Sequence, residues 1–427
     1  MGAVINAIIV DGLAVVHNIN VSIIKEFLEV TSTAEAPDSY FYWSSLAVIS
    51  GTVSDRVYLN KGGLYKLYPN IFIFLISKGS GLGKGIPVSY TEKTLTSCGT
   101  TRLIIGQSSI EGIESELSRA YTTSSGRIIN TAEATLLAGE FGSYLLANPR
   151  LFTDLTDLYD SQYHQGEWKK RLATKDTSTL KNICLTGLFA ANEVHFRDAV
   201  PTNAMKGGFV GRTILVYESK RRLLNSLIGN GVLKDISITE IVSNLKELSK
   251  LKGEFKITVD AAKLYNEWYY DFYKLDKELK DDTGTAERLR DNILKVAMLE
   301  SLSDDFNLTI EKEHIERGLI RCFQVYSSTI RLVIGEGKSS STNQTKAVLK
   351  IIFECGVQGE ISRKNLLIKG LQSGDFDYIE LDRVLEHLFQ VKIISQIENK
   401  GRDTIYKINL GAVNALLERE KRGGKND

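Results

Sequence analysis

The chain has little cysteine and histidine for its length. Its 427 residues include four cysteines and five histidines. The cysteines are far apart and form no CxxC pair: they are Cys98, Cys184, Cys322 and Cys355. This spacing predicts neither a disulfide framework nor a structural zinc site, and the scattered histidines give no metal-ligand pattern. Such cysteine usage fits a cytoplasmic protein.

The sequence also lacks an excess of either charge and any long apolar run. Its formal net charge is +1, so any site for nucleic acid or membrane must be a local patch. No apolar run approaches the roughly 20 residues that span a bilayer. The apolar segment Met1–Val16 has no basic start and is interrupted by Asp11. We therefore expect neither a signal peptide nor a membrane partner.

Proline is scarce as well, with five residues, and one segment is typical of a linker. Gly335–Lys346 reads GEGKSSSTNQTK, which is small, polar and turn-forming. A chain of this length has room for two or three domains. The expected parts are an N-terminal helical region (1–50), a core (51–235), a helical lid region (236–334), a linker (335–345), a C-terminal domain (346–412) and a flexible tail (413–427).

Apolar runs alternate with helical segments between residues 56 and 220. The runs, in order, read NIFIFLIS, TRLIIGQ, TLLAGE, NICLTGLFA and RTILVYE. That alternation predicts an α/β fold, with a largely parallel sheet and helices on its faces. Residues 236–333 are mostly helical by their apolar periodicity.

A glycine-rich segment follows the first of these runs and is close to a phosphate-binding loop. Its candidate nucleotide-binding residues are Gly79, Ser80, Gly81, Gly83, Lys84 and Gly85. Glycines let consecutive backbone N–H groups surround an anion, and the lysine reaches the β- and γ-phosphates. Two positions depart from GxxxxGK[ST]: Lys78 replaces the first glycine, and Gly85 replaces the hydroxyl that helps to hold Mg²⁺. The alternative is a glycine-rich turn that binds no ligand.

Two polar residues at the ends of later runs are candidate catalytic residues. Glu140 follows TLLAG, where a general base and magnesium ligand would lie, although Gly139 replaces the aspartate that usually precedes it. Mg²⁺ could still be held by phosphates, waters and Glu140, because it keeps much of its hydration shell. Asn192 ends the fourth run, where a polar side chain can orient the attacking water. The alternatives are a carboxylate that favours a helix start and an asparagine in a turn.

Arg212 lies between a glycine-rich turn and the fifth run. An arginine at such a domain edge can stabilise charge on the phosphoryl group of a neighbouring subunit's nucleotide. That arrangement requires a head-to-tail ring, in which each interface is heterologous. The alternative is a surface arginine that opens a strand.

Five segments in a fixed order make the pattern specific: APDSYFYWSSLAVISG, LYPNIFIFLISKGSGLGKG, LLAGEFGSYL, LTGLFAANE and GGFVGRTILVYESKRR. Together they resemble the uncharacterised P-loop ATPases of phages, prophages and mobile elements, which are related to superfamily 3 and AAA+ replicative helicases. The resemblance covers residues 20–335. It implies an ASCE-type P-loop NTPase core that uses ATP and Mg²⁺, a ring oligomer that we expect to be a hexamer, and a DNA-linked role.

The resemblance also implies a role for each candidate residue. Lys84 would be the phosphate-binding lysine, Glu140 the Walker B glutamate, Asn192 the sensor and Arg212 the arginine finger. A second sensor would be Arg288 or Arg290 in the helical lid.

Between the third and fourth runs lies YHQGEWKKRLATKDTSTLKN, where related helicases carry a β-hairpin that projects basic residues into the central channel. We expect this hairpin to hold single-stranded DNA through its phosphates, with stacking on an aromatic ring. The candidate DNA-binding residues are Trp168, Lys169, Arg171 and Lys175. Because a strand alternates its side chains, Lys169 and Arg171 should share a face without Lys170, and Lys175 should join it after the turn. The alternative is an exposed charged hairpin.

Residues 344–410 read as three helices followed by two strands, which is a winged helix-turn-helix pattern. The charged residues of the candidate recognition helix are Asp377, Glu380, Asp382, Arg383 and Glu386. Phosphates would repel so acidic a helix, so we do not expect it to read a major groove. The wing carries Lys400, Arg402 and Lys407, which can touch a DNA backbone; docking to a protein is the alternative.

These features predict a ring-forming, ATP-dependent DNA helicase or translocase of a phage or mobile element that acts in replication. Its expected partners are single-stranded or forked DNA, further copies of the chain, and a primase or initiator, in the host cell's cytoplasm if the source is viral. The alternative is an ATP-binding, DNA-binding initiator scaffold with little or no hydrolysis. The departures at Gly85 and Gly139 favour that alternative.

Overall fold

A computed structural model divides the chain into two compact units, Met1–Thr329 and Ile330–Asp427. The structure describes residues 22–148, 150–160, 167–172, 175–200, 208–225, 238–274, 284–333, 348–349, 351–352, 360–373, 378–390, 394–397 and 404–408.

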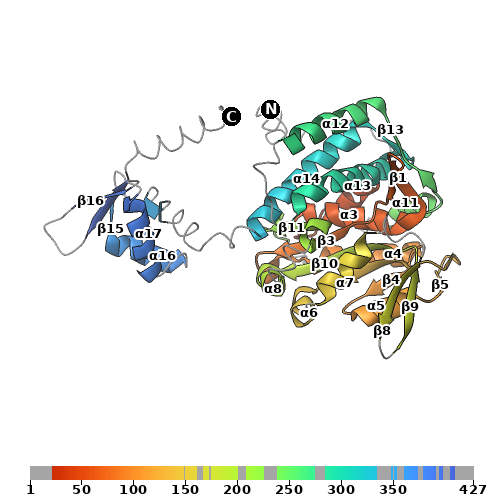
Figure 1. Cartoon of the computed structure of the whole chain (residues 1–427), viewed down its shortest axis with the longest axis horizontal. Coiled ribbons are helices and arrows are strands. Elements are labelled where there is room, and N and C mark those ends of the chain that lie inside the picture. The colour runs from red at the N-terminus through yellow and green to blue at the C-terminus, as the bar shows by residue number, and fades with distance from the viewer. Residues whose placement is uncertain are drawn as a thin grey trace. The chain divides into compact units, whose positions relative to one another are not determined.

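The first unit is built around a five-stranded sheet with the order β11-β3-β10-β7-β4 (Figure 1). Its strands are β3 (Phe72–Ser77), β4 (Leu103–Ile105), β7 (Glu133–Ala138), β10 (Cys184–Asn192) and β11 (Thr213–Glu218). All neighbouring strands in this sheet are parallel. Every residue of β3 and β7 is buried, as is typical of parallel strands that are covered on both faces. The predicted α/β fold and its five strands are therefore confirmed.

Helices cover both faces of the sheet (Figure 1). On one face lies α3 (Asp38–Val53). The helices packed around it are α2 (Ile23–Val30), α4 (Gly85–Cys98), α11 (Thr239–Leu248) and α13 (Thr285–Asp305). Those beside β10 on the other face are α6 (Gly142–Ala147), α7 (Arg150–Tyr159) and α8 (Glu193–Ala199). The other helices in the described part of the unit are α5 (Ile110–Leu117), α10 (Phe209–Arg212), α12 (Val259–Lys274) and α14 (Lys312–Val333). The short 3₁₀ turns there are η1 (Ser54–Arg56) and η2 (Ser80–Leu82).

Helix α3 is the centre of the hydrophobic core. It is buried from Tyr40 through Val53, as expected for a helix that is apolar on all sides. It approaches the sheet so closely that a Cβ on Gly51 would lie 2.2 Å from the hydroxyl oxygen of Thr135 on β7. The same core includes buried residues of α13 and α14, so the predicted core and lid regions share one compact unit.

Short strands lie outside the central sheet. One small sheet consists of β1 (Val57–Lys61), β2 (Tyr65–Leu67) and β12 (Gly253–Glu254). Two further sheets have two strands each: β5 (Tyr121–Thr122) pairs with β6 (Ile128–Ile129), and β13 (Lys256–Ile257) pairs with β14 (Thr309–Ile310). The expected hairpin is present as β8 (Glu167–Leu172) and β9 (Lys175–Lys181), which pair antiparallel. Its second strand leads into β10, so the base of the hairpin lies at the amino edge of the central sheet.

In its described residues the second unit contains a small antiparallel sheet and the helices α16 and α17, and Val348, Ile351 and Ile352 are helical as well. Its elements are β15 (Glu360–Ser362), α16 (Arg363–Ser373), α17 (Tyr378–Gln390), β16 (Ile394–Ile397) and β17 (Ile405–Ile408), with the strand order β15-β17-β16. The two strands predicted after the helices are β16 and β17, whereas β15 was not predicted. Three residues give too short a run for period-two alternation to reveal a strand. Its Ile361 is buried in a core with Leu366 and Leu385 of the two helices.

Candidate functional site

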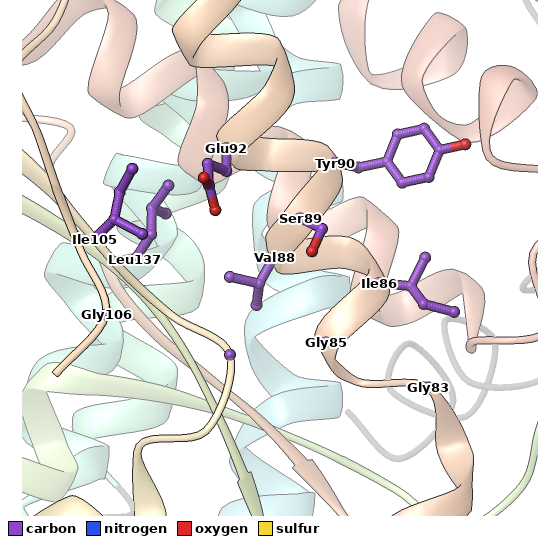
Figure 2. Close-up of a pocket in the computed structure, with 11 residues that line it drawn as sticks. Gly83, Gly85, Ile86, Val88, Ser89, Tyr90, Glu92, Ile105, Gly106 and Leu137 are labelled. Atoms are coloured by element: carbon purple, nitrogen blue, oxygen red, sulfur yellow. The ribbon is translucent and has the colours of Figure 1, made fainter.

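The glycine-rich loop after β3 has the backbone of an anion-binding turn. The turn η2 ends at Gly83, whose φ of 67° is left-handed and favours glycine. Helix α4 begins at Gly85, directly after Lys84. Figure 2 shows Gly83 and Gly85 where the loop enters this helix. A right-handed turn followed by a left-handed glycine and a helix start directs backbone N–H groups toward an anion.

Lys84 and Glu140 meet at this loop. The Lys84 Nζ lies 3.1 Å from the Glu140 Oε2, although 56 residues separate them in sequence. The lysine side chain is 10% exposed and the carboxylate is 48% exposed, so the lysine is held in place while the carboxylate can move. Helix α6 starts two residues later, with Phe141 as its N-cap and no side-chain cap, and the catalytic role of Glu140 stays a prediction. Parallel strands β3 and β7 bring the two residues together because both run toward the same edge.

Asn192 ends β10 at the same edge and caps helix α8. Its Oδ1 accepts a hydrogen bond from the backbone N–H of His195 at 2.7 Å, which is the turn chemistry considered as the alternative to a sensor. Its Nδ2 lies 3.1 Å from the His195 Nδ1. The sensor role of Asn192 stays a prediction.

Two residues at the carboxyl edge were missed by the sequence analysis. His195 Nδ1 lies 3.9 Å from the Glu140 Oε1, on the first turn of α8. Arg221, three residues past β11, forms an ion pair of 2.8 Å with Glu35. Its guanidinium also lies 3.1 Å from the place that a Cβ on Gly81 would occupy. A polar residue within three positions of a strand's carboxyl end was the available signal for both.

A pocket of about 550 Å³ lies between α4 and the carboxyl ends of β4 and β7. Val88 and Glu92 extend from α4 toward Ile105 and Leu137 across it (Figure 2). Gly85 and Gly139 also line the pocket. No heavy atom lies within 4 Å of a Cβ placed on either glycine, so the absent hydroxyl and the absent carboxylate would both fit.

The residues at this edge suit phosphates better than they suit a metal ion. Within the part of the chain that the structure describes, no group of three or more His, Cys, Asp or Glu side chains could hold a metal ion. Glu140 supplies one carboxylate, and the glycines at 85 and 139 supply no side-chain oxygen. A Mg²⁺ ion here would depend mainly on phosphate oxygens and water for its ligands.

Arg212 lies at the opposite edge of the sheet. It ends α10 just before β11, and its guanidinium donates to the Asp160 Oδ2 at 2.6 and 3.0 Å. Arg288 of α13 donates to the two oxygens of the same carboxylate at 3.1 and 3.3 Å. Burial alone would raise the pKa of Asp160, but the hydrogen bond and charges of the two arginines outweigh it and lower the pKa. Asp160 was not predicted, because its partners are 52 and 128 residues away.

The other candidate for a second sensor, Arg290, has different surroundings. Its side chain is hydrogen-bonded to Tyr269, and its backbone carbonyl accepts a hydrogen bond from Tyr265. Of the two lid arginines, Arg288 is therefore the one that joins Arg212.

The register of β8 and β9 places the basic positions of the hairpin opposite residues of the other strand. Lys169 pairs with Thr179, and Lys170 pairs with Ser178. Lys175 pairs with Leu172, because only two residues separate β8 from β9. Residues that are opposite each other share a face, but the register shifts between Lys170 and Leu172. Which face Lys175 joins therefore stays a prediction.

The predicted stacking residue Trp168 is partly buried at the base of this hairpin. It pairs with Leu180, whose side chain is fully buried. Lys169 and Arg171 alternate with Trp168, so their register positions fall on the face away from Leu180.

In the second unit two described basic residues form ion pairs. Lys407 pairs with Glu360 at 2.6 Å, and Arg363 pairs with Asp382 of α17 at 2.6 Å. The other wing residues, Lys400 and Arg402, and the helix residue Asp377 lie outside the described residues.

Comparison with models of known protein families gives no match, and a search of curated proteins gives none either. Among the helices of the described residues, none is both long and apolar enough to cross a membrane. The function must therefore be inferred from the site itself.

Proposed function

We propose that the chain is a P-loop ATPase of the ASCE/AAA+ kind and the motor of a ring-forming DNA helicase or translocase of a phage or mobile element. The observation that carries the proposal is the 3.1 Å contact of Lys84 and Glu140 beside a glycine-rich helix start. The strand order supports it, since β10 lies between β3 and β7 as the additional strand of an ASCE-type core does.

In this proposal the triphosphate lies at the N-terminal end of α4, where the glycine-rich turn and the positive end of the helix dipole favour an anion. Lys84 exchanges the carboxylate of Glu140 for phosphate oxygens, and the carboxylate is thereby released. Glu140 then orients the attacking water and accepts its proton. Glu140, phosphate oxygens and water molecules would hold a Mg²⁺ ion, which would neutralise part of the phosphate charge.

DNA and further copies of the chain complete the proposed assembly. The hairpin β8–β9 binds single-stranded or forked DNA, and six copies form the ring during replication. The second unit is a winged-helix domain in this proposal, supported by its helix pair and three-stranded antiparallel sheet. The acidic residues of α17 favour a protein partner for it, such as a primase or initiator, over a major groove. The proposed location is the cytoplasm, that of the host cell if the source is viral.

A second function is favoured by Gly85 and Gly139. Neither glycine provides the side-chain oxygen that would hold Mg²⁺ in a typical P-loop ATPase. A chain that binds ATP but hardly turns it over would serve as a nucleotide-dependent initiator scaffold on DNA.

The test is ATP binding and hydrolysis by the full-length protein, with and without single-stranded DNA, beside its Lys84→Ala variant. We expect binding and DNA-stimulated hydrolysis by the wild type, and neither by a variant with an unchanged circular dichroism spectrum. Unchanged nucleotide affinity in the folded variant would remove the loop assignment. Binding without hydrolysis would select the scaffold.

A further inference from the structure

Three cations surround the buried carboxylate of Asp160. Arg212 and Arg288 hydrogen-bond to it directly. The third cation, Lys295, donates hydrogen bonds to Asn70 and Tyr159. Because one carboxylate neutralises one charge, this group keeps two positive charges. The arginine side chains are 18% and 24% exposed, so neither of them is sealed inside the unit.

The position of this cluster excludes contact with the loop of its own chain. Arg212 precedes Thr213, which pairs with Phe72 at the first residue of β3, whereas the phosphate loop follows the last residue of that strand. Six residues of β3 at roughly 3.3 Å each place the two sites about 20 Å apart. An arginine side chain is far too short to span that distance.

We propose that Arg212 and Arg288 together contact the γ-phosphate of the nucleotide bound by a second copy of this chain, with Asp160 as their positioning residue. This inference rests on the proposed ring of ATP-binding subunits. It assigns Arg288 to the interface between copies and not to a sensor of its own nucleotide.

The chemistry of the cluster suits this role. Two guanidinium groups on one carboxylate are held with their N–H donors close together, and a phosphoryl group offers several acceptor oxygens to such a pair. A head-to-tail contact between copies brings the amino edge of one sheet to the carboxyl edge of the next. Since the groups are already positioned, little reorganisation is needed as charge develops on the transferring phosphoryl group.

Two subunit mixtures test the inference, with hydrolysis measured in rings shown to contain both variants. Arg288→Ala alone should bind ATP normally and lose about a hundredfold in hydrolysis. Mixed in equal amounts with Lys84→Ala, it should recover about a quarter of the wild-type rate if interfaces act independently, because one interface in four then joins an intact loop to both arginines.

Arg288→Ala mixed with Arg212→Ala should recover nothing, since every interface lacks one of the two arginines. If Arg288 served its own nucleotide, the outcomes would be reversed: this second mixture would recover activity and the first would not. An arginine whose loss unfolded the whole subunit would also leave the first mixture inactive, and it would lower the melting temperature of the variant.

Arg290→Ala is the matched control, two residues along the same helix and bonded to Tyr269. It should hydrolyse ATP at nearly the wild-type rate. Asp160→Asn should bind ATP, hydrolyse it slowly and be rescued by Lys84→Ala as Arg288→Ala is. If the wild type and Lys84→Ala behave as proposed but Arg288→Ala is not rescued, only this inference fails. A wild type without hydrolysis would overturn it together with the proposed function.

Discussion

The two edges of the central sheet are built differently. At the carboxyl edge, Lys84 and Glu140 neutralise each other near a pocket, and the carboxylate is half-exposed. At the amino edge, Asp160 is buried and receives four hydrogen bonds from Arg212 and Arg288. One edge is neutral and has room for a ligand, whereas the other is closely bonded and keeps surplus positive charge.

This difference indicates how one chain can carry two halves of a site. A loop that must admit and release a nucleotide needs room and a carboxylate that can move. Groups that stabilise developing charge work best when they are fixed beforehand. Both halves meet only if copies associate head to tail. Variants at either edge therefore test the difference between the two edges.

The largest expected effect is at the amino edge. Arg212→Ala should bind ATP with wild-type affinity and lose on the order of a thousandfold in hydrolysis, because the finger acts on the neighbour's nucleotide. Mixing with Lys84→Ala should restore part of the activity. Mixed rings that stay inactive would show that the trans role is wrong or that turnover requires concerted sites.

Stability should also differ between the edges. Asp160→Asn should lower the free energy of unfolding at pH 7 by about 2 kcal/mol, because it leaves buried cations without their carboxylate. The lowered pKa means that this contribution is complete above the unfolded pKa and is lost as pH falls through the folded pKa. The difference between wild type and variant in denaturant titrations should therefore shrink in acid.

Glu140→Gln is the control at the other edge. Its half-exposed carboxylate should contribute less than about 1 kcal/mol to stability. Equal losses in the two variants would contradict the contrast between a bonded edge and an open one.

The room at the carboxyl edge can be used to restore the missing magnesium contacts. Gly85→Ser with Gly139→Asp should raise Mg²⁺-dependent hydrolysis about tenfold, because both side chains have space and supply oxygens toward the metal. The measurement is the rate at increasing Mg²⁺ concentration. Gly83→Ala is the control: its left-handed backbone disfavours a Cβ, so nucleotide affinity should fall. A double variant with a wild-type rate would show that the metal is held in another way.

The smallest effect concerns the hairpin at the amino edge. Lys169→Ala with Arg171→Ala should weaken binding of single-stranded DNA and flatten its salt dependence by roughly 0.7 log unit per lost phosphate contact. Lys170→Ala changes the position that alternates with these two along β8, and should alter the slope less. Binding that is unchanged in the double variant would leave the hairpin as a solvated charged edge.

The sequence predicted the strands well because their apolar runs are local signals. The five strands of the central sheet were each visible as such a run, and the glycine-rich loop was visible because Gly83 and Lys84 are adjacent in the chain. The short strand β15 was not predicted, because a three-residue strand carries too little pattern.

By itself the sequence determined an α/β core, the place of the loop, and the order in which Lys84, Glu140, Asn192 and Arg212 follow the strands. Only the tertiary structure decided that Glu140 rests on Lys84, that Asn192 caps a helix, and that Arg288 joins Arg212 on Asp160. The physical reason is that strand order and helix packing set these distances. The parallel sheet sends residues far apart in sequence to one edge or the other, and nothing in a local pattern records which neighbours they meet there.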